Sequence, residues 1–353
     1  MDKLNRFFGL TLGGGGVRGI SYIGVFKSSE ERRIHWGNMA GVSVGSLMTA
    51  IKTAGYNAIE MQSLMDDFNF QKMQKTSVSE LPIIKRYKES LITRGKMNET
   101  EILELLNQPI RDKQYDINTS SRGNILNSIV TLSNEKVLYD GDYLEDWIYK
   151  VLALKEIRTF KDLRGGFKSE KNPNGYKIRM TCVDCTRVRL VVLPDDLTYY
   201  GINPDNFEVA KAVRISSSIP FVFSPVTLNK NGVKYNLIDG GVFDNFPFWL
   251  IDNSIYPAIG FKIKNKKNYL GISPINILQN IVSAVYDIGI PYHSKTEIDY
   301  IKDIEVSNIT TLDFNLSEEL KTMLIQSGYI AANNLFAQIR PYFFTDYVRR
   351  LIR

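Results

Sequence analysis

Apolar and polar positions near the N-terminus switch between two periodicities, which predicts alternating strands and helices. Residues 6–12 form an apolar run typical of a buried strand, and apolar residues at helical spacing over 17–33 predict a helix. A second strand is expected at 36–42 and a second helix at 46–54. This order, within about 55 residues, indicates a parallel sheet with crossover helices.

The middle of the chain, 57–158, is more polar and mostly helical in pattern. Asn98 and Glu101 have the spacing of a capping box, which predicts a helix over 99–108, and 141–154 has an amphipathic pattern. We interpret this region as a helical insertion. A lid or substrate channel and a purely structural element fit it equally well.

Strand patterns return at residue 176, with one further helix expected at 207–216. The predicted strands are 176–183, 188–193, 233–238 and 258–263. Helices are expected near the C-terminus at 274–286 and 317–339.

The predicted fold class is α/β, with a central, mostly parallel β-sheet flanked by helices. We expect a single domain over 1–353, because no linker interrupts the chain. Its core would comprise 6–55 and 176–265, with the insertion at 57–158 and a helical region at 274–353.

Composition is that of a soluble globular protein, with 44% hydrophobic and 23% charged residues. The net charge of +6 suits an anionic membrane surface or nucleic acid, or it is a solvated surface without a partner. No stretch approaches the roughly 18 apolar residues of a membrane span, so membrane contact would be peripheral. With two cysteines and no signal peptide, we expect a cytoplasmic protein, although a leaderless exported protein would have the same features.

The two cysteines, Cys182 and Cys185, form a C-x-x-C pair. A zinc ribbon would require a second pair, and a redox site would require a helix after the first cysteine. We therefore interpret both as packing residues on opposite faces of a strand.

Four consecutive glycines, Gly13 to Gly16, lie between the first strand and the first helix. Their N–H groups would converge at a helix N-terminus and bind an anion, either a phosphate or the oxyanion of acyl transfer. Gly14, Gly16 and Gly19 also satisfy G-x-G-x-x-G, so we consider a dinucleotide-binding oxidoreductase. That class requires an acidic residue at the end of the second strand, and 34–42 contains none.

The sequence Gly41-Val42-Ser43-Val44-Gly45 follows the second predicted strand and precedes a helix. In this context G-x-S-x-G indicates a nucleophile elbow, in which small flanking residues allow a tight turn that raises the serine above the sheet. Ser43 is therefore a candidate nucleophile.

Asp239 ends the strand predicted at 233–238 and is followed by Gly240 and Gly241. An acid at the carboxyl end of a strand lies where parallel α/β sheets place their active sites. The alternative is an ordinary turn residue, because Asp-Gly is a common turn pair.

Together, the three motifs resemble those of the patatin-like phospholipase family, which carries G-G-G-x-R-G, G-x-S-x-G and D-G-G in this order. The matching residues are 14–19, 41–45 and 239–241, and Gly13 stands where many members have Asp. The resemblance covers about the first 55 residues and 176–247, including Ser216-Ser217-Ser218, which it places near the site without a chemical role.

The resemblance implies that Ser43 is the nucleophile and Asp239 its general base. It also implies an oxyanion hole made by the N–H groups of Gly14, Gly15 and Gly16, with Arg18 supporting the loop or the charge. Gly41, Gly45, Gly240 and Gly241 would support the motifs.

The implied activity is that of a serine esterase of the phospholipase A or lysophospholipase type. It would cleave fatty-acyl esters of glycerophospholipids or lysophospholipids. The implied partner is a phospholipid or membrane surface rather than nucleic acid, and the chemistry requires no metal or cofactor.

Four alternatives remain at this point, one of which is the dinucleotide-binding oxidoreductase considered above. The order Ser43, Asp239, His293 matches an α/β-hydrolase triad, but such an elbow normally follows several strands rather than two. His35, the other histidine, precedes a strand. A non-catalytic lipid- or partner-binding module of the same fold, and a transacylase using an acceptor other than water, also fit the motifs.

Overall fold

A computed structural model describes residues 7–68, 141–220, 222–251, 256–266, 300–307, 309–313 and 316–339. The helices predicted at 99–108 and 274–286 and the candidate His293 lie outside these residues. So does most of the predicted insertion.

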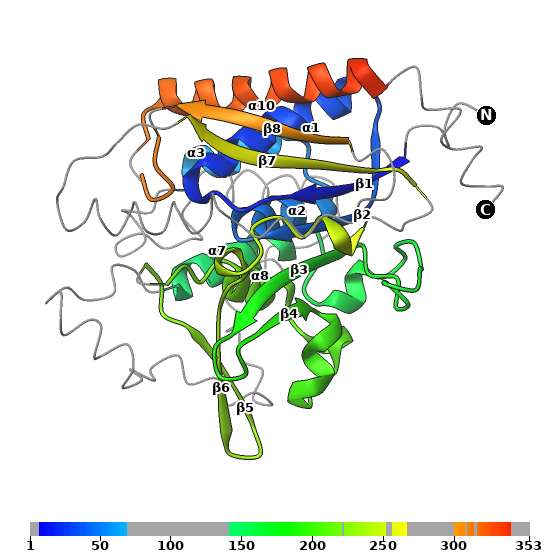
Figure 1. The fold of residues 1–353 in the computed structure, drawn as a ribbon, viewed down its shortest axis with the longest axis vertical. Helices are drawn as coiled ribbons and strands as arrows, with labels where there is room; N and C mark the ends of the chain where they lie inside the picture. Colours follow the sequence, from blue (N-terminus) through cyan, green and yellow to red (C-terminus); the bar gives the residue numbers. More distant parts are fainter. Residues whose placement is uncertain are drawn as a thin grey trace, which may run out of the picture.

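One β-sheet runs through the described chain (Figure 1). Its strands are β1 Phe7–Leu12, β2 His35–Val42, β3 Ile178–Asp184, β4 Arg189–Leu193, β5 Val226–Lys230, β6 Val233–Asp239, β7 Ala258–Lys266 and β8 Tyr300–Ser307. The order is β5-β6-β3-β2-β1-β7-β8, and β4 pairs with β3. The five strands from β3 to β8 in this order pair in parallel, while β4, β5 and β6 join by antiparallel pairing. The predicted α/β class with a mostly parallel sheet is confirmed.

Two strands, β5 and β8, were absent from the sequence-based prediction, and both lie at the ends of the strand order. β8 carries Lys302, Asp303 and Glu305. Charged residues of this kind are common on edge strands because they discourage pairing with another chain. They also weaken the apolar pattern on which the prediction depends.

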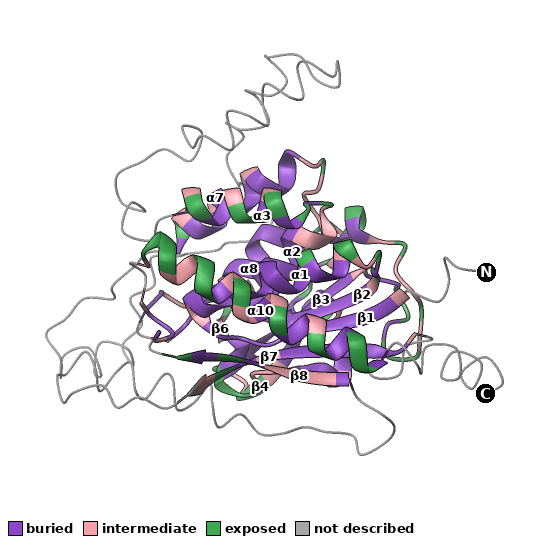
Figure 2. Ribbon diagram, turned by 90° about the horizontal axis from the view of Figure 1, so that it is seen from above, coloured by how far each residue is buried: buried purple, intermediate pink, exposed green. Residues whose placement is uncertain are grey.

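Helices cover mainly one face of the sheet (Figure 2). They are α1 Ser21–Glu31, α2 Val44–Thr53, α3 Ala58–Asp67, α7 Asp142–Ala153, α8 Val209–Ser216 and α10 Glu318–Ile339. Two neighbouring residues of β2 show that each face of the sheet has its own core. Met39 belongs to the large core under the helices, and Ala40 belongs to a smaller core. The second core contains Phe248, Leu250 and Ile251, which pack against the opposite face of the sheet.

The first helix and the last described helix, α1 and α10, pack closely together. A Cβ built on Gly24 of α1 would lie 1.9 Å from the Ile325 carbonyl oxygen, and one on Gly328 of α10 would lie 1.8 Å from that of Ser21. Both helices therefore need glycine where their backbones touch. The Ser28 hydroxyl also contacts the Asn333 side chain at 2.6 Å.

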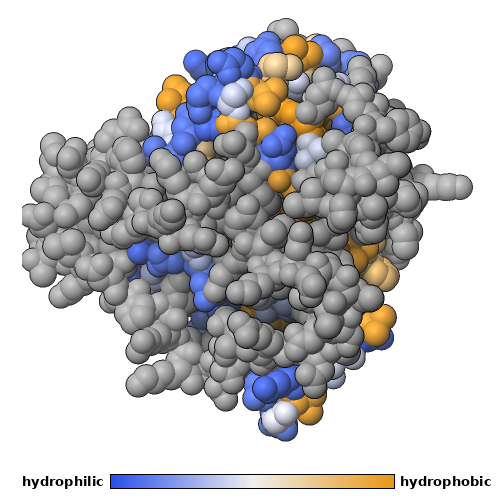
Figure 3. All heavy atoms as spheres, turned by 90° about the vertical axis from the view of Figure 1, so that its left-hand side faces the viewer, coloured by the Kyte–Doolittle hydropathy of each residue, from blue (hydrophilic) through white to orange (hydrophobic). Residues whose placement is uncertain are grey.

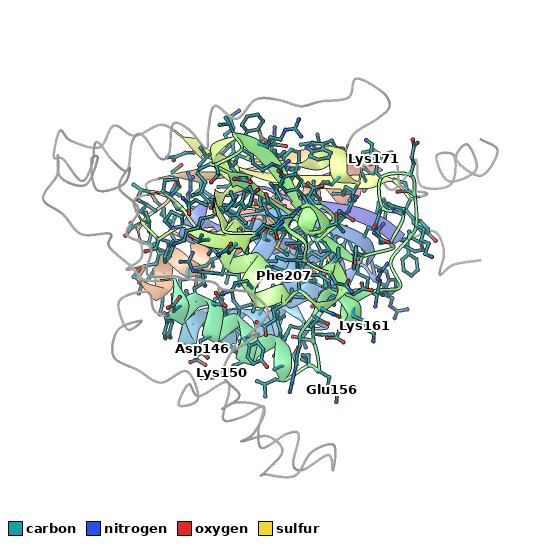
Figure 4. All side chains as sticks on the ribbon, turned by 90° about the horizontal axis from the view of Figure 1, so that it is seen from below. Asp146, Lys150, Glu156, Lys161, Lys171 and Phe207 are labelled. Atoms are coloured by element: carbon teal, nitrogen blue, oxygen red, sulfur yellow. The ribbon has the colours of Figure 1, made fainter. Side chains whose placement is uncertain are left out.

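Polar and apolar side chains are intermingled where the described surface near α10 is visible in Figure 3. At the top of Figure 3, hydrophobic and hydrophilic residues lie together on the α10 side of the molecule, where Met323 is 58% exposed. On α7, Asp146 and Lys150, both labelled in Figure 4, form an i,i+4 ion pair of 2.9 Å. Among the described residues, no helix is long and apolar enough to cross a membrane.

Both cysteines are free. Cys182 is buried in β3 and Cys185 is exposed just beyond it. Burial raises the pKa of each thiol, so both remain protonated at neutral pH. The predicted packing role is confirmed for Cys182 and is wrong for Cys185, which is exposed in the turn after β3.

We predict that Gly328→Ala destabilises the fold by about 1–3 kcal/mol, because the added methyl group would enter the Ser21 backbone and the two helices would have to separate. Gln326→Ala, at an exposed position of the same helix, should change the free energy of unfolding by less than about 0.5 kcal/mol. Urea unfolding of both variants checks this, and equal stabilities would contradict it.

Candidate active site

Ser43 lies on a strained turn between β2 and α2. Its φ is 55°, in the left-handed region that non-glycine residues rarely adopt, and its ψ is −127°. A Cβ on Gly41 would lie 2.5 Å from the Gly45 backbone, so the chain folds back on itself as tightly as glycine permits. The strand-turn-helix geometry expected of a nucleophile elbow is present, and Gly45 also lies where a Cβ would be 2.2 Å from the Leu12 carbonyl oxygen.

The amide of Ser43 is held from the end of α8. Its N–H donates to the Ser216 hydroxyl, with 3.0 Å between N and Oγ. That hydroxyl donates to the Thr181 carbonyl of β3 at 2.8 Å. Since this bond uses the only proton of Ser216, Ser46 must be the donor in the 2.8 Å contact between the Ser216 and Ser46 hydroxyls. One buried hydroxyl therefore links the elbow, α2, α8 and β3.

Asp239 comes beside Ser43 because β2 and β6 share one flank of β3. Strand β4 pairs with both Thr181 and Cys182 and so occupies the other flank along this stretch. On the shared flank, Val42 of β2 pairs with Thr181, and Asp239 of β6 pairs with Cys182. The carboxyl ends of β2 and β6 therefore meet head to head, and Ser43 directly follows Val42.

The parallel-sheet rule invoked for Asp239 is wrong for this strand, because β6 runs antiparallel to β3. Asp239 reaches the site because β6 approaches from the opposite direction and ends where β2 leaves the sheet. The Asp239 carboxylate is fully buried, and its Oδ1 accepts from the Gly241 N–H at 2.8 Å. Gly240 lies so close to Thr181 that a Cβ would be 2.5 Å from the Thr181 carbonyl oxygen.

The glycine loop after β1 is fixed at its beginning from three sides. The Gly13 N–H donates to the Phe261 carbonyl and the Gly14 N–H to the Asn245 carbonyl, each at 3.1 Å. The Tyr22 hydroxyl donates to the Gly13 carbonyl at 2.7 Å. Burial raises the pKa of Tyr22 far above its usual value, so the hydroxyl keeps its proton and stays a donor.

This loop lies against the elbow, since a Cβ built on Gly14 would be 3.4 Å from the Cβ of Ser43. Because the Gly14 N–H is engaged with Asn245, the predicted set of three oxyanion donors is reduced to Gly15 and Gly16. Among the backbone hydrogen bonds of the described turns and loops, none uses the N–H of Gly15 or Gly16.

Arg18 is buried behind the loop. Its Nε donates to the Gly15 carbonyl at 3.1 Å, and its Nη2 donates to the Thr311 hydroxyl at 2.8 Å. In a trans peptide the C=O and the following N–H point in opposite directions. The Gly16 N–H therefore points away from Arg18, which holds this peptide from behind.

A cavity of about 220 Å³ opens beside Ser43 and Gly16. Its walls come from α2, α3, α7, α10 and the segments around them. The apolar lining residues are Val17, Ile20, Val44, Leu47, Met48, Met65, Phe68, Leu144, Ile219, Phe223 and Leu316. Such a cavity suits a hydrocarbon chain rather than a polar group.

One part of the cavity wall is charged. Lys321 lies between two carboxylates, with its Nζ 2.7 Å from Glu318 Oε1 and 3.7 Å from Asp66 Oδ1. Burial raises the pKa of Asp66, and Lys321 partly offsets this. Ser217, one of the serines expected near the site, also lines the cavity.

His35 is far from this site. It begins β2, is exposed, and stacks on Phe7 with 5.2 Å between ring centroids. Ser43 follows the opposite end of the same eight-residue strand, a distance of roughly 25 Å. His35 is therefore excluded as a base for Ser43.

The sequence also matches a family model. The model for patatin-like phospholipase matches residues 10–252, which include the glycine loop, Ser43 and Asp239. The chain belongs to the patatin-like phospholipase family. Lipid hydrolysis is the activity that membership of this family supports.

Individual relatives of this patatin-like chain are distant. It is 29% identical to Uncharacterized protein YqhO of Bacillus subtilis (strain 168), over 89% of this chain and 93% of that one. It is 24% identical to Probable lipid hydrolase 463L of Invertebrate iridescent virus 6, over 73% and 65% respectively. The crystal structure of VipD from Legionella pneumophila shares the fold, with a TM-score of 0.51, 19% identity, and coverage of 94% of this chain and 67% of that one.

We predict that Ser216→Ala lowers the free energy of unfolding by about 2–4 kcal/mol, since the Ser43 amide and the Thr181 carbonyl both lose a buried partner. Ser29→Ala is a matched control. Ser29 is equally buried, but its hydroxyl makes only a local bond to the Phe26 carbonyl within α1. Its loss should cost about 1 kcal/mol. Denaturant unfolding compares the two, and equal losses would show that Ser216 has no special structural role.

Proposed function

We propose that this protein is a serine acyl hydrolase that cleaves fatty-acyl esters of glycerophospholipids or lysophospholipids, with Ser43 as nucleophile and Asp239 as general base. The observation that carries the proposal is the meeting of β2 and β6. It puts a serine on a strained turn beside a buried carboxylate, at the opening of an apolar cavity.

The proposed reaction begins when Asp239 takes the Ser43 hydroxyl proton and Ser43 Oγ attacks the ester carbonyl carbon. The carbonyl oxygen becomes an oxyanion, which accepts hydrogen bonds from the Gly15 and Gly16 N–H groups. As the tetrahedral intermediate collapses, the alcohol leaves with the proton from Asp239. Water activated by Asp239 then releases the fatty acid from Ser43. An alcohol in place of this water would make the same site a transacylase.

The lining of the cavity supports an acyl chain as the group bound beside Ser43. Burying each methylene of such a chain contributes about 0.8 kcal/mol. The proposed partner is therefore a phospholipid, reached at a membrane surface. The basic net charge of +6 is consistent with an anionic surface.

We predict that wild-type protein releases fatty acid from mixed phospholipid vesicles, and that Ser43→Ala and Asp239→Asn lower the rate by about 10⁴-fold. Asn keeps the shape of Asp239 but cannot accept the serine proton. His293→Ala should retain wild-type activity, because the proposed dyad uses no histidine.

Loss of activity in the His293→Ala variant would instead indicate a triad. Release by wild type that persists in Ser43→Ala would contradict the proposed nucleophile. Vesicle binding without release by any variant would identify the chain as a lipid-binding module.

The cavity generates a separate prediction about chain length. Met65 lines the cavity from α3, so Met65→Trp should reduce its depth. We expect the ratio of kcat/KM for palmitoyl over butyryl p-nitrophenyl esters to fall about tenfold, within the range that methylene-sized changes in hydrophobic pockets produce. Met323→Trp, at an exposed position of α10, is the control. A ratio unchanged by Met65→Trp would mean that acyl chains bind elsewhere.

A further inference from the structure

Residues beyond 252 lie outside the stretch that matches the family model, yet they touch the glycine loop. The segment 309–313 follows β8 and precedes α10. Ile309 and Leu312 anchor it in the main core. In Figure 1, β8 and α10 lie on the same side of the molecule as α1, at the end of the sheet formed by β1, β7 and β8.

Thr311, in this segment, contacts three consecutive residues of the loop. A Cβ on Gly16 would lie 2.0 Å from the Thr311 carbonyl oxygen. The same oxygen accepts from the Val17 N–H at 3.2 Å, and the Thr311 hydroxyl accepts from Arg18 Nη2 at 2.8 Å. Thr311 is fully buried.

We infer that Thr311 is a positioning residue for the oxyanion loop, and this inference rests on the proposed function. The Thr311 hydroxyl orients the Arg18 guanidinium, Arg18 holds the Gly15 carbonyl, and that carbonyl sets the direction of the Gly16 N–H. Thr311 does not touch the substrate. It acts through Arg18 on the direction of one hydrogen-bond donor.

The helices and core residues packed around Thr311 and Arg18 make this positioning rigid. The α1 helix continues from the loop through the short helix Gly16–Ile20, and α10 packs on α1 with backbone contact at Gly24 and Gly328. The Arg18 side of the hydrogen bond is therefore fixed to α1, and the Thr311 side is fixed to the main core through Ile309 and Leu312. A donor aimed before the substrate arrives needs no reorganisation during the reaction.

Thr311→Val tests the inference, because it removes the hydroxyl and keeps the side-chain shape and the backbone bond to Val17. We expect kcat for a soluble ester, and the rate at which a fluorophosphonate labels Ser43, to fall about tenfold while KM changes by less than about twofold. Loss of one oxyanion donor costs about 10²–10³ in kcat, and an indirect effect should be smaller. Thr311→Ser, which keeps the hydroxyl, should retain both rates.

Thr310→Val is the matched control, since Thr310 is the neighbouring residue and only partly buried. If Thr311→Val does not fold, Thr311→Ser and Thr311→Ala form a second pair that differs only in the hydroxyl. Equal rates in that pair, or a loss in Thr311→Val no greater than in Thr310→Val, would overturn the role of Thr311 and leave the proposed function intact. A wild-type protein whose Ser43 neither hydrolyses esters nor reacts with the fluorophosphonate would overturn both.

Discussion

The whole site depends on how the flank of β3 is divided between two strands that arrive from opposite directions. Strand β2 occupies the first part and turns away after Val42, and β6 ends beside the next position with Asp239. Backbone hydrogen bonding fixes this register, and a shift by one residue would turn the Asp239 side chain to the other face of the sheet. The relative position of Ser43 and Asp239 is thus a property of the sheet itself.

The remaining parts of the site form hydrogen bonds around the point where β2 and β6 meet. Where β2 leaves the sheet, the Ser216 hydroxyl accepts from the Ser43 N–H and donates to the Thr181 carbonyl of β3. Asn245, just beyond the Asp-Gly-Gly motif, binds the start of the glycine loop through its carbonyl. Motifs separated by more than two hundred residues of sequence, such as Gly14 and Asn245, therefore contact one another directly. Few of these polar contacts face solvent, so their geometry is set by packing rather than by water.

The sequence alone predicts the elements that carry local signals. The strand-turn-helix context of Ser43, the strand before Asp239 and the helix at α10 are examples. It does not predict the antiparallel direction of β6, because strand direction depends on pairing between distant segments. For the same reason the engagement of Gly14 by Asn245, and the contacts of Tyr22 and Thr311, carried no sequence signal. A buried threonine after an edge strand resembles any other core residue.

The hydrogen bond between Arg18 and Thr311 joins residues 293 positions apart. During synthesis, the glycine loop leaves the ribosome long before the segment that braces it. The residues of β1, β2, the elbow and β6 are therefore all synthesised before Thr311, which contacts the loop through Arg18. The hydrogen bond between Arg18 and Thr311 forms only after residue 311 has been made and Ile309 and Leu312 have packed into the main core.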